Sequence, residues 1–459
     1  MFFFNSLNLL ISGLILLGSY SAAAAKKPNI LLIIADDMTW SDCQPYGSPN
    51  VKTPHLQKLA NQGMRFDGMF TGTAMCSPTR QQLYTGIFPI RNGAFANHSQ
   101  VHKGVKSIVH HLSELGYRVS LEGKKHIGPQ QSFPFKNLNL AKVLATTDKP
   151  FCHIVASHDP HKPWTTGDAT AFDPAKLVVP PNLIDTPEVR QQLCHYYAEI
   201  SHLDTTVGKI LKSLEQAGVA KNTLVIFTTE QGMTLPFGGK WLCYDTGLKT
   251  GFLVRWPGVV KPGSSTSALT QYVDVVPTLV EIAGGDPTRI DTGCADADGK
   301  HGFDGRSFLS ILKGENDQLR NYVYGIQTTK GIFNGHNYPV RSVRNQRYQY
   351  IRNLNHQAEF NNSYTEGGVF HREYYLPLVA AAKDSPAVKS RLALFKKRPY
   401  EELYDLTKDP YELHNLANSP ELLETKKKLS DALDAFMRQQ NDRGIETEEK
   451  CPSRLGRAQ

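Results

Sequence analysis

Four short runs rich in apolar residues stand out in the first two thirds of the chain, at residues 30–34, 117–121, 151–157 and 224–227. Runs of Ile, Leu and Val of this kind are typical of central parallel strands that are buried on both faces. Stretches of helical character separate the runs. This alternation predicts an α/β fold with a mostly parallel sheet sandwiched by helices, between residue 29 and about residue 320.

Charged and polar residues follow each apolar run directly. They are residues 36–37 after the first run, 123–126 after the second, 158–161 after the third and 230–231 after the fourth. Ligands of open α/β sheets bind outside the carboxyl ends of the strands. We therefore expect these residues to meet at one edge of the sheet and to form a site there.

The predicted helices carry start and stop signals of their own. Pro54 suits the first position of a helix that Thr53 caps and that ends before Gly63. Residues 186–218 predict a long amphipathic helix, whose aromatic residues Tyr196 and Tyr197 are interpreted as packing residues.

The character of the chain changes near residue 320. Short polar-aromatic strands are predicted at residues 322–324 and 348–351, and a terminal helix at about 422–440. We predict a catalytic domain over residues 26–320 and a smaller C-terminal α+β subdomain over residues 321–459.

The N-terminus resembles a secretory signal. An apolar run at residues 7–18 has signal-peptide length, and Ala23-x-Ala25 fits the small-x-small cleavage rule, so residues 1–25 are predicted to be removed before Lys26. Because the first six residues contain no Lys or Arg, an uncleaved anchor is the alternative. No later segment is apolar enough to span a bilayer. We expect a periplasmic or secreted protein with no stable membrane insertion after cleavage.

The amino-acid composition adds little to the predicted fold and function. The chain has 459 residues, of which 40% are hydrophobic and 20% charged, as expected of a globular protein with a sizeable core. A net charge of +8 suits an anionic substrate but is spread along the chain, and no nucleic-acid partner is predicted. The seven cysteines are an odd number without the close spacing of a zinc site, and their pairing stays open.

Residues 76–86 contain the strongest chemical signal. Pro78 favours the first turn of a helix, so Cys76 is expected at its N-terminus, where free N–H groups attract anions. Arg80, one turn later, lies on the same face as Cys76. The pattern indicates a site that holds an oxyanion, although a buried cysteine before a proline-initiated helix would have the same sequence.

Five ordered blocks between residues 29 and 417 resemble the type I sulfatases, whose signature is Cys-x-Pro-x-Arg followed by Leu-x-Thr-Gly. The blocks are residues 76–86, 123–128, 160–163, 240–258 and 403–416. The resemblance implies an alkaline-phosphatase-like fold and a sulfuric ester hydrolase in which Cys76 is oxidised to formylglycine. Thr79 stands where the family usually has Ser or Ala and keeps a hydroxyl.

The resemblance also implies a metal site. Its ligands are position 76 and an all-oxygen set, which favours Ca²⁺ over zinc or copper: Asp36, Asp37, Glu230 and Gln231. The family usually has Asp-Asn or Asp-His where this chain has Glu230-Gln231. Each of these side chains is one methylene longer, and calcium tolerates such a change better than magnesium because its coordination is more flexible.

The catalytic mechanism is likewise implied by the resemblance. One hydroxyl of the formylglycine hydrate attacks sulfur, and the second then collapses to the aldehyde and expels sulfate with help from His126. Arg80, Lys124 and Lys240 are suited to neutralising the sulfate oxygens. His161 is suited to protonating the leaving alcohol, assisted by Lys240.

The implied substrate is a sulfated carbohydrate, attacked from a chain end. Residues 91–102 and the motifs at 123–126 and 158–161 resemble N-sulfoglucosamine sulfohydrolases and bacterial sulfatases of algal polysaccharides. Substrate-binding roles are predicted for His98, His158 and Asp159. A formylglycine-generating or maturase enzyme is the implied protein partner.

Two alternatives stay open. The same fold class also hosts phosphoester and phosphonate hydrolases, although one metal-ligand set and a cysteine-type modification motif favour sulfate. A catalytically impaired homologue that only binds polysaccharide is the other alternative, and the replacement by Glu230-Gln231 is its only support.

Overall fold

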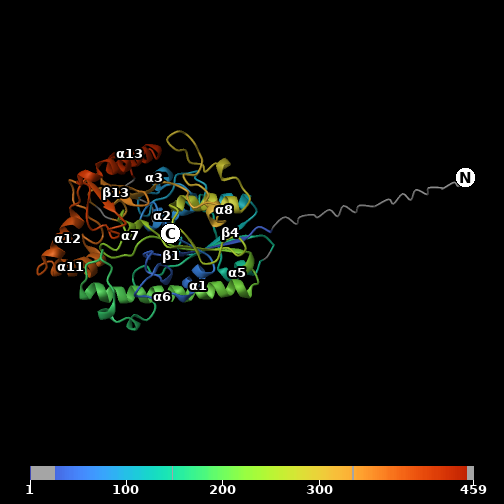
Figure 1. The fold of residues 1–459 in the computed structure, drawn as a ribbon, viewed down its shortest axis with the longest axis horizontal. Coiled ribbons are helices and arrows are strands. Elements are labelled where there is room, and N and C mark those ends of the chain that lie inside the picture. The colour runs from blue at the N-terminus through green and yellow to red at the C-terminus, as the bar shows by residue number, and fades with distance from the viewer. Residues whose placement is uncertain (2–25, 147, 333–334, 452–459) are drawn as a thin grey trace.

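The computed structural model describes residues 26–146, 148–332 and 335–451, together with Met1. Its main sheet has eight strands in the order β5-β4-β6-β1-β7-β8-β2-β9, with helices on both faces (Figure 1). The four predicted apolar runs form the centre of this sheet. They are β4 (Arg118–Gly123), β6 (Phe151–Ala156), β1 (Asn29–Ala35) and β7 (Thr223–Thr229).

These four strands are parallel neighbours, as predicted. Every residue of β1 is buried, and its alternate side chains enter two different cores. The remaining strands are shorter, and β8 runs antiparallel to both β7 and β2, so the sheet is mixed at this side. Their bounds are β2 (Met64–Phe66), β5 (Lys136–Asn137), β8 (Phe252–Arg255) and β9 (Ser264–Thr266).

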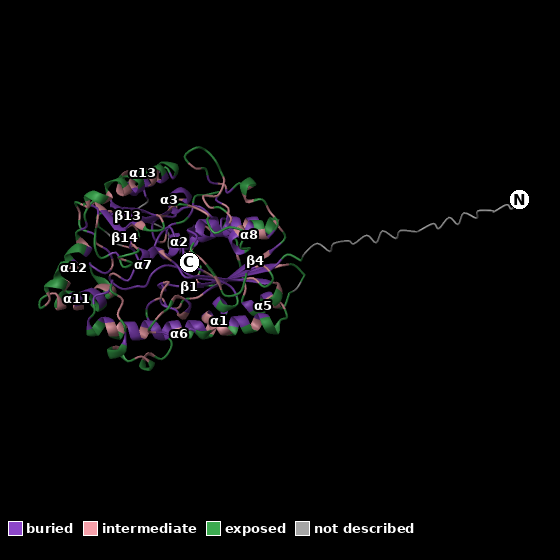
Figure 2. Cartoon of the chain, viewed as in Figure 1, coloured by how far each residue is buried: buried purple, intermediate pink, exposed green. Residues whose placement is uncertain are grey.

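Helices pack on both faces of the sheet. One face is covered by α1 (Pro54–Asn61), α5 (Leu140–Leu144) and α6 (Pro187–Gln216). The other is covered by α2 (Cys76–Thr85), α4 (Ile108–Glu114) and α8 (Val275–Ile282). Figure 2 shows α6 with a buried inner stripe and exposed outer turns. This is the amphipathic pattern that the sequence predicted.

One predicted detail is only partly confirmed. Thr53 occupies the N-cap position before Pro54, as predicted, but its side chain makes no capping hydrogen bond, and its hydroxyl accepts from the Gln44 N–H instead. The first turn is capped from α6 instead, by the Asp204 carboxylate, which accepts from the N–H groups of His55 and Leu56. A carboxylate at that end also complements the helix dipole.

The C-terminal part forms a second, antiparallel sheet in the order β11-β12-β13-β14. Its strands are β11 (Val323–Gln327), β12 (Val340–Arg344), β13 (Tyr348–Asn353) and β14 (Glu401–Asp405). The predicted terminal helix is α13 (Leu423–Gln439), which packs on β12 and β13. The proposed boundary at residue 320 stays a prediction, with β11 the first strand beyond it.

Shorter elements connect these layers. They are α3 (Pro89–Asn92), α7 (Asp245–Leu248), α9 (Leu309–Leu312), α10 (Gly368–Phe370), α11 (Leu376–Ala381), α12 (Pro386–Lys396), α14 (Ile445–Glu449), β3 (Met69–Phe70) and β10 (Thr270–Gln271).

All seven cysteines are free and buried. The predicted signal segment lies outside the described residues, and in the described part of the chain no helix is long and apolar enough to cross a membrane.

Candidate active site

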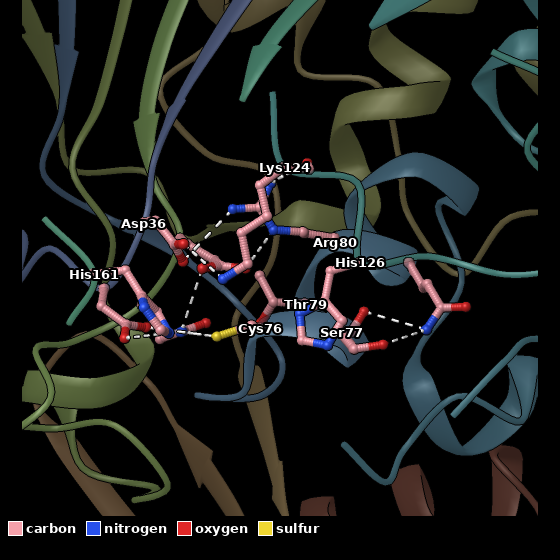
Figure 3. Close-up of polar contacts among 12 residues, drawn as sticks. Asp36, Cys76, Ser77, Thr79, Arg80, Lys124, His126 and His161 are labelled. Atoms are coloured by element: carbon pink, nitrogen blue, oxygen red, sulfur yellow. Dashed lines mark hydrogen bonds and ion pairs between the residues drawn. The ribbon is translucent and has the colours of Figure 1, made fainter. Parts of the chain in front are cut away.

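The polar residues that follow the central strands converge as predicted. Asp36 and Asp37 follow β1, Glu230 and Gln231 follow β7, and Lys124 follows β4. Cys76 is the first residue of α2, whose N-terminus faces this edge, and Figure 3 shows Asp36, Arg80, Lys124 and His161 gathered around it. Parallel strands deliver their following residues to one edge, which is why residues nearly 200 positions apart in sequence meet here.

Cys76 is buried in this cluster, with 3% of its surface exposed. Its Sγ is 3.2 Å from Gln231 Nε2 and 3.6 Å from Asp37 Oδ1. Burial opposes ionisation, but the charges of Lys124 and Lys240 outweigh it and hold the pKa of the Cys76 thiol well below its ordinary value. The surroundings therefore stabilise negative charge at position 76.

Three buried carboxylates in the cluster are each paired with a cation. Lys124 Nζ lies 2.6 Å from Asp36 Oδ2, and Lys240 Nζ lies 2.5 Å from Asp37 Oδ2. Arg80 Nε lies 2.7 Å from Glu230 Oε1, and both side chains are fully buried. Unpaired charges would be very costly at this depth. Each carboxylate thus has a cationic partner, so a bound divalent cation would add positive charge that attracts an anion.

The oxygen atoms of the cluster fit a metal ion. One ligand atom each from Asp36, Asp37, Cys76 and Glu230 lies within 4.8 Å of the others. Asp36 Oδ1 and Gln231 Oε1 are buried and have no hydrogen-bond partner among the described residues. Buried oxygens are normally satisfied, and carboxylate and amide oxygens are the ligands that Ca²⁺ prefers.

The longer Glu230-Gln231 pair is accommodated by its partners. Glu230 uses one oxygen for Arg80, and Gln231 Nε2 lies 2.6 Å from Asp37 Oδ1 and 3.4 Å from Glu230 Oε2. A half-turn of the amide exchanges its oxygen and nitrogen positions. That rotation would direct the unpartnered Gln231 oxygen at the other candidate ligands.

His161 lies at the open side of the site. Its Nε2 is 3.5 Å from Asp37 Oδ2, and its side chain is 33% exposed. Burial and Lys240 act against protonation, but Asp37 and Cys76 outweigh them and raise the pKa of His161. Its Nδ1 lies 2.6 Å from the Lys162 carbonyl, and Lys162 Nζ in turn lies over the rings of Trp164 and Tyr374. This anchor fixes the orientation of the His161 ring.

His126 contacts His98. Its Nε2 lies 2.7 Å from His98 Nδ1, and the Asn97 amide nitrogen lies 3.2 Å from His98 Nε2. Both histidines have left-handed backbones, with φ of 51° at His126 and 62° at His98. Such conformations are uncommon for residues other than glycine and cluster at functional sites. The structure therefore places His98 in direct contact with His126.

The other two predicted substrate-binding residues, His158 and Asp159, differ in their contacts. His158 is exposed, and partial desolvation of its ring lowers its pKa against the opposing charge of Asp36. The Asp159 carboxylate lies 2.8 Å from His202 Nδ1 of α6, and its backbone carbonyl accepts from the Asp36 N–H. The Asp159 side chain is thus engaged with α6, and its role toward substrate stays a prediction.

The sulfatase family description matches residues 28–143 and 136–285. A second description, the C-terminal part of N-sulphoglucosamine sulphohydrolase, matches residues 236–365. Together they cover most of the described chain.

The chain belongs to the sulfatase family.

Relatives of this sulfatase include an ulvan-active sulfatase of Formosa agariphila, 34% identical over 92% of this chain and 82% of its own length. Human N-sulphoglucosamine sulphohydrolase is 29% identical over 89% of both chains. The chain is thus a sulfuric ester hydrolase, which confirms the reaction class predicted from the sequence.

Solved structures confirm the predicted alkaline-phosphatase-like fold. An enzyme bound to its substrate D-glucosamine-2-N,6-O-disulfate superposes with a TM-score of 0.69 at 20% identity, covering 93% of this chain and all of the other. The phosphonate monoester hydrolase of Agrobacterium radiobacter superposes with a TM-score of 0.66 at 18% identity, covering 90% and 96%. The fold is therefore shared with phosphonate chemistry, and the family match carries the assignment to sulfate.

Three residues that contact or surround the predicted site residues were not singled out in the sequence. Thr234 donates to Asp37 Oδ2 at 2.5 Å, and Tyr364 approaches from the C-terminal part. Gln81 joins three segments: its Nε2 donates to the Ser99 carbonyl at 2.9 Å, and its Oε1 accepts from the N–H groups of residues 101 and 128. One indication of the role of Gln81 was available in the sequence: it lies inside the Cys76 motif, and a polar side chain on a buried helix requires hydrogen-bond partners.

We predict that His98 orients His126 and that its loss lowers turnover. His98→Leu removes the contact at 2.7 Å and should reduce kcat about 10- to 100-fold, as is usual when the partner of a functional histidine is lost. His98→Asn is the matched control, because Asn tolerates the left-handed backbone and keeps polar atoms near the Nδ1 position. Its kcat should stay close to that of the wild type. Equal losses in both variants would contradict the orienting role.

Proposed function

We propose that the protein is an exo-acting carbohydrate sulfatase that removes sulfate esters or sulfamates from a sulfated polysaccharide or oligosaccharide. The observation that carries the proposal is the position of Cys76, buried at a helix N-terminus among Arg80, Lys124 and Lys240. The two relatives whose names include ulvan and N-sulphoglucosamine support a sulfated sugar as substrate.

Two groups complete the proposed site. Formylglycine derived from Cys76, made by a separate maturation enzyme, supplies the hydrated aldehyde as nucleophile. Calcium, held by Asp36, Asp37, Glu230, Gln231 and position 76, supplies positive charge where the nucleophile and the sulfate meet. Asp36 Oδ1 and Gln231 Oε1, which accept no hydrogen bond from the described residues, support this ligand set.

The side chains around position 76 have distinct proposed roles. Lys124 and Lys240 bind the sulfate oxygens, and their charge acts in a buried, water-poor place where it is most effective. Arg80 holds Glu230 and Asp36 in place and adds to the positive potential. His161, whose pKa is raised, donates a proton to the leaving oxygen of the sugar. His126 takes the proton from the second hydroxyl at position 76 as the aldehyde re-forms and sulfate leaves.

The depth of the site supports attack from a chain end. Position 76 is almost completely buried, and Tyr364 of the C-terminal part packs on Trp241 beside Lys240, with 4.8 Å between the ring centres. A terminal sugar can insert into such a site, whereas the middle of a polymer cannot. Export to the periplasm or the exterior, where such polymers are found, agrees with the predicted signal segment.

The function is tested by incubating the purified, matured protein with a panel of sulfated mono- and oligosaccharides and measuring released sulfate. We expect release from at least one terminal sulfated sugar and little release from internal positions. Phosphate and phosphonate monoesters serve as the comparison. A higher kcat/KM for these esters than for every sulfated sugar would favour the alternative reaction.

The proton-donor role of His161 predicts a dependence on the leaving group. His161→Ala should lower kcat/KM for sugar sulfates about 10²- to 10⁴-fold, because an alkoxide leaves poorly without a proton. An aryl sulfate, whose phenolate leaves unaided, should lose far less. His126→Ala is the matched comparison and should slow both substrates to a similar extent. Equal losses on both substrates for His161→Ala would transfer the acid role to Lys240.

A further inference from the structure

Tyr364 is a buried residue of the C-terminal part that reaches the catalytic cluster. Its ring packs against Trp241, which directly follows Lys240, with 4.8 Å between ring centres. Its backbone is fixed from both sides, since the Tyr364 N–H donates to Asn362 Oδ1 at 2.9 Å and the Tyr364 carbonyl lies 2.8 Å from His371 Nδ1. The ring therefore has a defined orientation.

The Tyr364 hydroxyl is buried without a protein partner. The residue is 1% exposed, and its hydroxyl makes no hydrogen bond to any residue that the structure describes. A buried tyrosine hydroxyl usually has a partner, because leaving it unpaired costs stability. Burial raises the pKa of Tyr364, and the charges of Asp37 and Cys76 add to this against the opposing charge of Lys240, so the phenol stays protonated and can donate.

Among the described residues, the groups whose charges act on Tyr364 leave its hydroxyl without an acceptor. Lys240 is itself a donor. Asp37 Oδ2 already accepts from Thr234 and Lys240, each at 2.5 Å, and Asp37 Oδ1 accepts from Gln231 at 2.6 Å. The acceptor must therefore arrive with a ligand. The ligand that binds beside Lys240 is the sulfate group of the substrate.

We propose that the Tyr364 hydroxyl donates a hydrogen bond to a sulfate oxygen of the bound substrate, next to Lys240. This inference rests on the proposed function. It makes the C-terminal part a direct contributor to the reaction centre. It also explains why an unpaired hydroxyl is kept in a buried position, where phenylalanine would pack equally well without the cost of a polar group.

The test is Tyr364→Phe, which removes only the hydroxyl. We expect kcat/KM for a sugar sulfate to fall about 10- to 100-fold, the range for a hydrogen bond to a charged group. The inhibition constant of inorganic sulfate should rise by a similar factor. The thermal unfolding midpoint should stay the same or increase, because an unpaired buried polar group has been removed.

Tyr338→Phe is the matched control. Tyr338 is also fully buried with no hydrogen-bond partner for its hydroxyl in the described part of the chain, but the charges that act on it are Arg398 and Glu402. Its kcat/KM and its inhibition by sulfate should equal those of the wild type.

Two results would overturn the proposed contact. One is wild-type kcat/KM and sulfate inhibition in Tyr364→Phe, and the other is a loss of kcat/KM with unchanged inhibition by sulfate. If the wild type released no sulfate from any sugar, the proposed function would fail, and calorimetric binding of inorganic sulfate to wild type and Tyr364→Phe would still decide the contact. Equal affinities in that measurement would overturn it.

Discussion

Replacing Cys76 should abolish turnover while the fold survives. Cys76→Ala removes the side chain that formylglycine requires, and Cys76→Ser leaves a hydroxyl whose sulfate ester would be slow to hydrolyse. Both should lower kcat at least about 10⁴-fold, the scale of losing a nucleophile. Because the side chain is small and makes only weak contacts through Sγ, the thermal unfolding midpoint should change little.

Cys294→Ser is the matched control for the loss of a buried thiol. Cys294 is 7% exposed and its Sγ lies 3.2 Å from the Arg91 carbonyl, a contact that a serine hydroxyl can replace. This variant should keep wild-type turnover. Peptide mass spectrometry of active wild type should show position 76 with an aldehyde in place of the thiol. Full activity in a protein whose Cys76 is entirely unmodified would refute the mechanism.

Loss of the proposed calcium site should have the next largest effect on turnover. Asp37→Asn is the sharpest variant, because Asn suits the left-handed backbone at this position, where φ is 57°, and because it keeps the size of the side chain. It removes the charge that a cation needs and leaves the buried Lys240 without its partner. We expect kcat to fall about 10³-fold or more, since a metal supplies several kcal/mol of charge stabilisation.

Calcium binding should be lost together with activity. Adding calcium to the chelator-treated wild type should raise its thermal unfolding midpoint, because a ligand that binds only the folded state stabilises it. Asp37→Asn should show no such increase. Asp159→Asn is the control, since its carboxylate pairs with His202, and it should respond to calcium like the wild type. An unchanged calcium response in Asp37→Asn would mean that the metal site lies elsewhere.

The strand framework and the sheet edge could be predicted from the sequence because both depend on local patterns. A buried parallel strand requires a continuous apolar run, and the residue after it must reach the carboxyl edge. This is why Asp36, Lys124 and Glu230 could be assigned to one site although they are far apart in the chain. The position of Cys76 at a helix N-terminus followed similarly from Pro78.

The partners of these side chains could not be predicted in the same way. No pattern in the sequence indicated that the Asp159 carboxylate pairs with His202 of α6 or that His98 lies against His126. Thr53 was expected to cap α1, yet Asp204 of α6 does so. Each of these contacts depends on how separate segments of the chain pack together. The residue pattern of one segment does not predict which residues of another segment it will contact.

The sequence by itself determined the α/β fold, the edge where the chemistry takes place and the kinds of side chain gathered there, since strand length, turn position and helix starts are local properties of the backbone. The tertiary structure alone decided how the charges pair, with Arg80 on Glu230 and Lys240 on Asp37. It also decided that Tyr364, from beyond the main sheet, reaches the same cluster. The physical reason is that hydrogen bonds and ion pairs act over a few ångströms, so their partners are selected only when distant segments pack together.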